Sequence, residues 1–402
     1  MLTMSSVYGY TQLTGGKDAM EDDIPSLIAY FESLEDPRVV GRTSHKLIDI
    51  IVITICAVIS NAETWEEVHD YGHQKEDFLR RFLDLPHGIP SHDTFCRVFG
   101  IISPDSIQTC FVEWTRSLMK GKRREVIAID GKTARRSGSP CQSKSPLHLV
   151  SAWASEAGVV LGQEACDEKS NEITAIPKLL DVLELKGNIV TTDALGSQKA
   201  IAKQVRAGGG DYVFALKGNH KLLYEAAQSL FKKAKRQRWR GYEYDWYETT
   251  ESGHGRKERR KYWTIQERPA IEDLGWFLFR KEPWPDLNVI GVVESERTIN
   301  GQTSTETRYY VSSIENNAEV LAKAVRGHWG VENNLHWMLD VVFREDHDRN
   351  RSGHAQNNLS LVRKIALNLI KQEKTKKGSI KGRRKHAGWN DQYLLKILGV
   401  ET

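Results

Sequence analysis

The chain has 402 residues and a formal net charge of +4 at pH 7, and this length allows two or three domains with a substantial core. Its five cysteines are odd in number and form no close-spaced pair, which argues against a disulfide framework or a zinc knuckle and favours a reducing cytosol. The N-terminus has no basic segment followed by an apolar core, and the longest apolar run, 47–59, is too short to cross a bilayer. We therefore expect a cytoplasmic protein without a secretory signal or a membrane partner.

The first part of the chain predicts a tail and a helical domain. Residues 1–22 are polar and contain glycines and serines, so we expect a flexible N-terminal tail. Apolar residues recur at helical spacing over residues 23–119, and the run from Leu47 to Ile59 predicts a buried helix. Pro90 breaks the chain, and Ser91 can cap a further helix. This all-helical domain either packs on the rest of the chain or holds a helix-turn-helix that reads DNA.

The periodicity changes at Val126, where an α/β domain begins. The predicted strands span 126–130, 147–155, 159–166, 189–193 and 212–217, and the predicted helices span 173–183 and 197–206. Three strands, a helix, a strand, a helix and a strand follow one another, which is the order of a ribonuclease H-like mixed sheet with flanking helices. We assign residues 120–219 to the first part of this domain.

Residues 220–316 interrupt the α/β pattern. Asn300 and Gly301 lie between two runs of strand character, and this dipeptide strongly favours a tight turn between antiparallel strands. We therefore predict a mostly β, basic insertion. Helical spacing returns near Ala318, so residues 317–372 are assigned to the last part of the α/β domain and residues 373–402 to a basic C-terminal tail.

Three acidic residues occupy positions that suggest chemistry. Asp130 and Asp193 each end a predicted buried strand, and Glu332 lies in a helical stretch, so the fold would bring them together at one end of the sheet. Carboxylates that converge in one cleft stay ionised only with cations between them, and such clusters suit Mg²⁺ or Mn²⁺. Two such ions clamp the attacking and leaving oxygens of a phosphodiester. The pattern predicts metal-dependent cutting or joining of nucleic acid.

These positions also have plainer explanations. An aspartate at a strand end is common, and three nearby acids compete with Glu332 as the third carboxylate: Asp340, Glu345 and Asp346. His328 and His336 lie four residues on either side of Glu332, which offers a rival hypothesis of a zinc or two-metal site on one helix. Successive turns of a straight helix do not easily bring all three of these side chains onto one ion.

Basic residues gather in separate runs, which favours contact with phosphates or a solvated surface. Trp239 and Trp263 interleave with the two inner runs and could stack on bases. The second inner run comprises Arg256, Lys257, Arg259, Arg260 and Lys261. The predicted DNA contacts, including the first inner run, are Lys132, Arg135, Arg136, Lys217, Asn219, Lys232, Lys233, Lys235, Arg236, Arg238, Arg240, Arg326 and His328.

Several sequence blocks resemble one family. AIDGKTAR, TTDALGSQKAIA, DYVFALKGNH, GHWGVENNLHWMLDVVFREDHDRNR and GIPSHDTFCRVF are similar, in this family's order, to blocks of the H-repeat-associated (ISAs-type) bacterial insertion-sequence transposases of the DDE superfamily. The resemblance covers residues 24–372. It implies a ribonuclease H-like catalytic domain with a β insertion, and a catalytic triad of Asp130, Asp193 and Glu332 that binds two Mg²⁺ ions, with Mn²⁺ able to substitute.

Two departures from the family pattern concern the site. Relatives commonly carry histidine where this chain has Gly196. The wider DDE group places Tyr, Arg and a basic residue around the glutamate, where this chain has Val325, His328 and Leu339. His328 is therefore a candidate to replace a phosphate contact.

The resemblance implies a DNA transposase that hydrolyses a phosphodiester at insertion-sequence ends and then transfers the freed 3′ hydroxyl to target DNA. Its partners would be double-stranded DNA, as element ends and target, and further copies of the chain in a homo-oligomer on DNA. Its location would be the nucleoid in the cytoplasm. Two alternatives remain open: a catalytically degenerate DNA-binding relative, and a magnesium-dependent nuclease without strand transfer.

Overall fold

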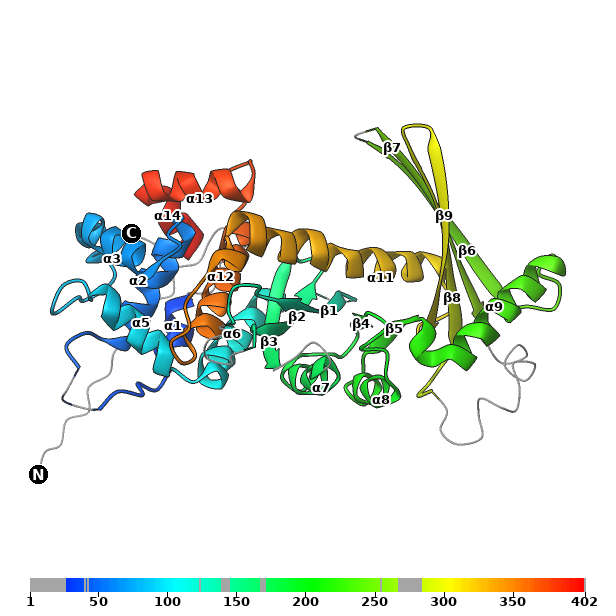
Figure 1. The fold of residues 1–402 in the computed structure, drawn as a ribbon, viewed down its shortest axis with the longest axis horizontal. Coiled ribbons are helices and arrows are strands. Elements are labelled where there is room, and N and C mark those ends of the chain that lie inside the picture. Colours follow the sequence, from blue (N-terminus) through cyan, green and yellow to red (C-terminus); the bar gives the residue numbers. More distant parts are fainter. Residues whose placement is uncertain are drawn as a thin grey trace, which may run out of the picture.

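The computed structural model describes residues 27–39, 41, 43–122, 124–138, 145–166, 171–253, 255–266 and 284–400. The tail expected over residues 1–22 lies outside these ranges, as does Cys141. The molecule is elongated, with a helical domain at one end, a sheet covered by helices on both faces in the middle, and a group of long strands at the other end (Figure 1).

The N-terminal domain is helical, as the apolar spacing predicts. Its helices are α1 (Leu27–Phe31), α2 (Leu47–Ile59), α3 (Trp65–Gln74), α4 (Glu76–Leu79), α5 (His92–Ile101) and α6 (Pro104–Met119). Helix α5 begins where predicted, because the Ser91 hydroxyl accepts a hydrogen bond from the Thr94 N–H. Helix α2 is buried along almost its whole length. Within the described ranges, no helix combines the length and apolarity needed to cross a membrane.

The central region contains the predicted strands and helices. They are β1 (Val126–Thr133), β2 (His148–Ala154), β3 (Val159–Cys166), α7 (Glu172–Val182), β4 (Ile189–Thr192), α8 (Lys199–Ala207) and β5 (Asp211–Leu216). In the sheet these strands have the order β3-β2-β1-β4-β5. β1 pairs in parallel with β4, and β4 with β5, whereas β2 is antiparallel to both β1 and β3. The protein is therefore a mixed α/β protein, as expected.

The insertion extends this sheet. It consists of α9 (Lys221–Arg236), β6 (Tyr244–Gly253), β7 (Arg256–Gln266), β8 (Val289–Ile299) and β9 (Gln302–Ser312). β9 pairs with β5, so the described strands form one nine-stranded sheet. The turn between β8 and β9 is confirmed, because Asn300 and Gly301 both have positive φ. The 16-residue helix α9 was not predicted.

The two faces of the sheet bury different helices. On one face α7, α8 and α9 pack through residues such as Leu179 and Phe231. On the other face α11 (Ala318–Val331) packs through residues such as Leu321. Because side chains alternate along a strand, neighbouring residues of β7 belong to different cores: Tyr262 lies on the α11 face and Trp263 on the α9 face. This alternation also sorts the basic residues of the insertion.

The chain returns to the helical domain after α11. Helix α11 continues into two π-helical segments, Glu332–His336 and Met338–Val342, and α12 (Ala355–Gln372) comes next. Helix α12 is buried on nearly every side and packs against α2 and α5. Helix α12 also bonds to the sheet, because the Asn368 side chain accepts from the N–H and donates to the carbonyl of Val160 on β3. It therefore lies between the N-terminal helices and the sheet, and the assignment of residues 317–372 to the α/β domain stays a prediction.

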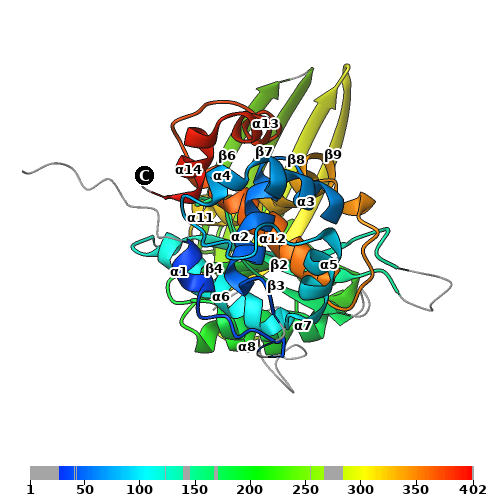
Figure 2. The same cartoon turned by 90° about the vertical axis from the view of Figure 1, so that its left-hand side faces the viewer.

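The expected basic C-terminal tail is instead folded. Residues 373–400 contain α13 (Ile380–Trp389) and α14 (Asp391–Leu398), which pack beside α2 and α12 (Figure 2). Two arginines of the basic run are buried: Arg383 contacts the Glu373 carboxylate at 2.7 Å, and Arg384 donates to the backbone carbonyls of Val58 and Val342. Both guanidinium groups therefore stabilise the packing of the C-terminal helices, and only part of the basic run faces solvent.

We expect Arg384→Ala to lower the free energy of unfolding by about 3 kcal/mol, because two buried carbonyls lose a charged donor. The side chain also lies over the Phe343 ring, with 4.1 Å between the guanidinium carbon and the ring centroid. Urea denaturation measures the change. Lys385→Ala, an exposed neighbour on the same helix, is the matched control and should change stability by less than about 0.5 kcal/mol. Equal stability of the two variants would contradict the structural role of Arg384.

Candidate functional site

Strand pairing brings Asp130 and Asp193 together. The parallel register of β1 and β4 aligns Ile129 with Thr192. Asp130 is the next residue of β1 and Asp193 directly follows β4, so the two aspartates lie side by side. The predicted end of the first strand at Asp130 is wrong, because β1 continues to Thr133 through its pairing with β2. The predicted juxtaposition of these two residues is present in the structure.

The turn after β4 holds the Asp193 side chain. Its Oδ1 accepts hydrogen bonds from the N–H groups of Leu195, at 2.9 Å, and Gly196, at 3.1 Å. A Cβ on Gly196 would lie 2.8 Å from Thr192 Cβ and 2.9 Å from Ile176 Cδ1, so this turn has no room for a side chain. Glycine at position 196 therefore fits the close packing of the turn on α7.

Helix α11 carries Glu332 towards the two aspartates. Gly327 lies directly on β1, because a Cβ there would be 2.9 Å from Val126 Cγ1. Further along the helix, His336 Nδ1 lies 3.5 Å from Asp130 Oδ2. The helix advances about 13 Å over the nine steps from Gly327 to His336. The strand advances about the same distance, about 13 Å, over the four steps from Val126 to Asp130. Helix α11 thus runs alongside β1 in the same direction, and Glu332 lies one turn before His336.

The helix changes its geometry at Glu332. From this residue to His336 the chain is π-helical, which widens the turn and rotates the side chains relative to an α-helix. Single π-helical turns inside α-helices frequently mark functional sites. The Glu332 side chain is exposed. Helical spacing in the sequence does not reveal this change.

Electrostatics couple the three carboxylates. Burial raises the pKa of Asp130 to about 7, and the negative charges of Asp193, Glu172 and Glu332 act in the same direction. The Gly131 N–H opposes this rise. Asp130 thus senses both of the other predicted site residues, together with Glu172, which sequence reasoning missed. We refer to Asp130, Asp193 and Glu332 as the carboxylate site.

The two histidines of the α11 face are not arranged as ligands of one ion with Glu332. Burial lowers the pKa of both His328 and His336 to about 4, so both rings are neutral at pH 7. His328 Nδ1 lies 3.0 Å from the Thr191 hydroxyl, and His336 faces Asp130. Among the described residues no group of three His, Cys, Asp or Glu side chains is close enough to hold an ion. These contacts do not support the zinc hypothesis. The same finding covers Asp130, Asp193 and Glu332, whose side chains are likewise not close enough together to form such a group. A phosphate contact by His328 stays a prediction.

Lys132 is occupied by acidic partners. Its Nζ lies 2.7 Å from Asp340, 2.8 Å from Glu345 and 3.4 Å from Asp346, and only 10% of its side chain is exposed. The three acids that competed with Glu332 in the sequence therefore neutralise Lys132. These partners account for the charge of Lys132 inside the protein, and a DNA contact by this residue stays a prediction.

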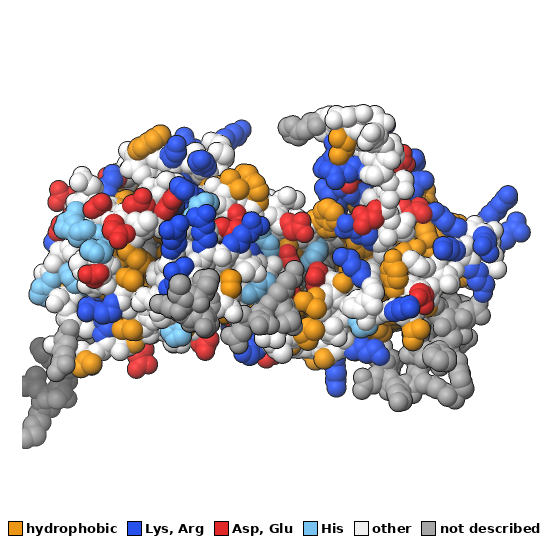
Figure 3. Space-filling view, in the orientation of Figure 1, with side chains coloured by type: hydrophobic (Ala, Val, Ile, Leu, Met, Phe, Trp, Pro, Cys, Tyr) orange, Lys and Arg blue, Asp and Glu red, His pale blue; other side chains and the backbone are white. Residues whose placement is uncertain are grey.

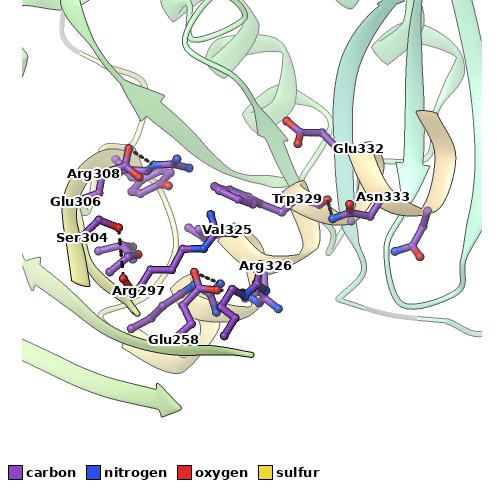
Figure 4. Close-up of a pocket in the computed structure, with 17 residues that line it drawn as sticks. Glu258, Arg297, Ser304, Glu306, Arg308, Val325, Arg326, Trp329, Glu332 and Asn333 are labelled. Atoms are coloured by element: carbon purple, nitrogen blue, oxygen red, sulfur yellow. Dashed lines mark hydrogen bonds and ion pairs between the residues drawn. The ribbon is translucent and has the colours of Figure 1, made fainter. Parts of the chain in front are cut away.

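A cavity of about 500 Å³ lies between α11 and strands β7, β8 and β9. We call it the arginine pocket, because five arginines line it together with Glu258, Glu306 and Glu332: Arg256, Arg260, Arg297, Arg308 and Arg326. Arg297, Arg308 and Arg326 surround one end, and Glu332 and Asn333 lie at the other (Figure 4). The Arg308 guanidinium carbon is 4.4 Å from the centroid of the Trp329 ring. Glu332 is the member of the carboxylate site that lines this cavity. Four of the arginines already contact glutamates: Arg256 and Arg260 contact Glu258, Arg308 contacts Glu306 and Arg326 contacts Glu251.

Strand alternation explains which arginines enter this pocket. Arg256, Glu258 and Arg260 occupy every second position of β7, as do Ser295 and Arg297 on β8. Sequence reasoning missed Arg297 and Arg308, although both share the parity of buried residues on their strands. In the space-filling view the surface is hollowed between the strands of the insertion and the helical domain (Figure 3).

The first inner basic run lies on the opposite face of the sheet. Lys232, Lys233, Lys235 and Arg236 belong to the end of α9, and Arg238 and Arg240 come directly after it. Helix α9 packs on the face that α11 does not occupy. The expectation that both inner runs lie beside the carboxylate site is therefore wrong for the first run.

The tryptophans of the inner runs are packed together. The Trp239 ring stacks on Tyr244, at 4.5 Å between centroids, and on Trp263, at 6.3 Å. Trp263 is buried. Lys235 lies over Trp263 and contacts Glu294 at 2.5 Å. These rings stabilise α9 against β7, and Trp263 is not free to stack on bases.

Four further predicted DNA contacts lie near the carboxylate site. Arg135 and Arg136 are exposed just after β1, and Arg135 Nε is 3.4 Å from Asp346. Lys217 is exposed at the end of β5, the neighbour of β4. The Asn219 amide donates to the Ala194 carbonyl, so it supports the Asp193 turn.

Comparison with known proteins identifies the class. The family model described as "Transposase DDE domain" matches residues 121–369, and the model described as "DDE_Tnp_1-associated" matches residues 28–115. The chain belongs to the family of DDE-domain transposases.

Its curated relatives narrow this class to the H-repeat-associated branch. The chain is 40% identical to "H repeat-associated putative transposase YhhI" of Escherichia coli K12, over 94% of this chain and 98% of the relative. It is 40% identical to "Putative transposase YncI" of E. coli O157:H7, over 93% and 95%. It is also 43% identical to "Inactive transposase YbfQ" of E. coli K12, over 19% of this chain and 90% of that short relative. The resemblance seen in the sequence is confirmed.

One solved structure overlaps loosely. It is a piggyBac transposase synaptic complex with hairpin DNA, with a TM-score of 0.40 and 11% identity, covering 94% of this chain and 79% of that one. A superposition this loose does not bear on the fold.

Proposed function

We propose that this protein is a metal-dependent DNA transposase that hydrolyses phosphodiesters at the ends of an insertion sequence and transfers the freed strand to target DNA. Asp130, Asp193 and Glu332 are its catalytic residues in this proposal. Its substrate is double-stranded DNA.

The topology supports this proposal. Three antiparallel strands followed by two parallel strands, in the order β3-β2-β1-β4-β5, is the arrangement of a ribonuclease H-like fold. The insertion of α9 and β6–β9 lies between β5 and the helix that carries Glu332. This matches the order of segments that the family resemblance implies.

The observation that carries the proposal is the convergence of charges on Asp130. Asp193 lies at the neighbouring strand end, and both Asp193 and Glu332 raise the pKa of Asp130. The competing acids Asp340, Glu345 and Asp346 bind Lys132 instead. Glu332 is therefore the best candidate for the third carboxylate.

The donor chemistry fits a divalent cation. Oxygen ligands from Asp and Glu are those that Mg²⁺ and Mn²⁺ prefer, and the mutual repulsion on Asp130 is what a cation would relieve. Two bound ions would activate the attacking oxygen and stabilise the leaving oxygen. The protein's own contribution is to fix the two aspartates on paired strands, to bring Glu332 across on a rigid helix, and to hold DNA in line for displacement.

The arginine pocket provides a place for the DNA backbone. Glu332 and five arginines line it together. Arginine binds phosphate oxygens through a planar fork of donors. Arg135 and Arg136 after β1 and Lys217 after β5 are also exposed and could add phosphate contacts.

A cleavage and joining assay tests this function. We expect purified protein with Mg²⁺ or Mn²⁺ to cut labelled insertion-sequence ends and to join the 3′ ends to a target plasmid. Ca²⁺ should support little chemistry, because its looser coordination holds the reacting oxygens poorly. Cleavage without joining would favour the nuclease alternative, and DNA binding without cleavage would favour a degenerate relative. Activity with zinc alone that needs His328 and His336 would contradict the carboxylate site.

Assembly as a homo-oligomer on DNA and a location at the nucleoid remain predictions from the resemblance. Sedimentation of the protein with and without element ends addresses the first.

A further inference from the structure

A buried pair of polar side chains, His148 and Glu172, lies behind β1. Along β1, Asp130 and Lys132 face α11, so Gly131 and Thr133 face α7. On that side His148 Nε2 lies 2.8 Å from Glu172 Oε1, and only 3% and 4% of the two side chains are exposed. His148 Nδ1 lies 2.7 Å from the Thr133 hydroxyl. One imidazole thus connects β2, the end of β1 and the first residue of α7.

This pair is in direct contact with the peptide next to Asp130. A Cβ on Gly131 would lie 2.3 Å from Glu172 Oε1 and 2.5 Å from His148 Nε2. The φ angle of Gly131 is not positive, so the glycine is required here by this contact and not by its backbone conformation. The pair therefore packs directly against the backbone of β1 at Gly131, the residue after Asp130.

Stability alone does not explain such a pair. Removing two ionisable groups from water costs several kcal/mol, and apolar residues of similar size often stabilise a core equally well or better. Glu172 also places a negative charge near Asp130, which makes the site harder to keep ionised. A role in positioning the Asp130 carboxylate explains why the protein keeps the pair despite the cost of burial and the added negative charge near Asp130.

We propose that His148 and Glu172 are positioning residues for Asp130: they hold the backbone at Gly131 and thereby set how well Asp130 binds the divalent cation. This inference rests on the proposed function, because it takes Asp130 to be a cation ligand. Neither residue needs to touch DNA or the ion. Thr133 is part of the same arrangement, because its hydroxyl forms a hydrogen bond with Nδ1 of His148.

Cation binding by the full-length protein tests the proposal without using activity. Mn²⁺ affinity is measured by electron paramagnetic resonance, and folding by circular dichroism and thermal melting without metal. We expect Glu172→Ala to lower Mn²⁺ affinity by about tenfold or more, the usual effect of removing a group that orients a ligand. Glu172→Gln should retain most of the affinity, because its amide oxygen still accepts from His148. DNA affinity should not change.

The matched control is Lys178→Ala on the same helix, which removes an exposed ion pair with Glu164 and should leave Mn²⁺ affinity unchanged. If Glu172→Ala does not fold, Thr133→Val decides: Thr133 is exposed, and this variant should weaken Mn²⁺ binding in the same direction. Wild-type affinity in both Glu172→Ala and Thr133→Val overturns the positioning role alone. Mn²⁺ binding that survives Asp130→Ala overturns this inference together with the metal role in the proposed function.

Discussion

Glu332→Gln should abolish cleavage of insertion-sequence ends while leaving their binding intact. The substitution keeps the size of the side chain and removes the charge that attracts a cation. Metal-assisted stabilisation of a phosphoryl transition state is worth several kcal/mol, so the cleavage rate should fall by about 10³-fold or more. Asp130→Asn and Asp193→Asn should have the same effect, because the three carboxylates act on one site. Single-turnover cleavage and a gel-shift assay on the same DNA measure the two properties.

Asp340→Asn is the matched control for this series. Asp340 lies on the same helical stretch, but its carboxylate contacts Lys132 at 2.7 Å, and Glu345 and Asp346 remain to hold that lysine. We expect its cleavage rate to stay within a few-fold of the wild type. A tolerated Glu332→Gln together with an inactive Asp340→Asn would show that the third carboxylate is assigned wrongly.

Neutralising the arginine pocket should flatten the salt dependence of DNA binding. The triple variant Arg256→Gln, Arg297→Gln and Arg308→Gln removes three charges that face α11. Each lost phosphate contact lowers the slope of log affinity against log salt by about one, so the slope should fall by up to about three. The loss should be nearly independent of sequence, because phosphates carry no base identity. Titration of two unrelated duplexes against salt measures both.

The control variant replaces three basic residues on the other face of β7. Lys257, Arg259 and Lys261 alternate with the pocket residues along β7 and point away from α11. Arg259 already contacts Glu248 at 2.7 Å. Their glutamine variant should keep the wild-type slope. A slope that falls only in this control, or only when Lys232 to Arg240 are neutralised, would place the DNA on the α9 face.

Local signals in the sequence identified much of the fold and of the site. Short apolar runs that end in aspartate predicted both strands, and Asp193 directly follows β4, because a buried strand tends to stop where a charge needs solvent or a partner. The same rule failed for Asp130, because pairing with β2 carries β1 on to Thr133. Asn300 and Gly301 predicted a hairpin, since a type I′ turn needs positive φ at both positions. Ser91 predicted a helix start. In each case neighbouring residues contain the whole physical cause.

Contacts between distant segments decided the rest. Whether a basic residue is free depends on what folds beside it: Lys132 meets three acids from a segment about 210 residues later, and Arg384 reaches the Val58 carbonyl on α2. The face on which a basic residue lies depends on strand parity and on which helix covers that face. The run at the end of α9 is therefore separated from Arg256 and Arg260 of β7, although both belong to one insertion. The contact of His148 with Glu172 has no sequence signal, because it joins the start of β2 to the start of α7. Local sequence carries the conformational preferences of the backbone, whereas burial and charge pairing come only from the assembled chain.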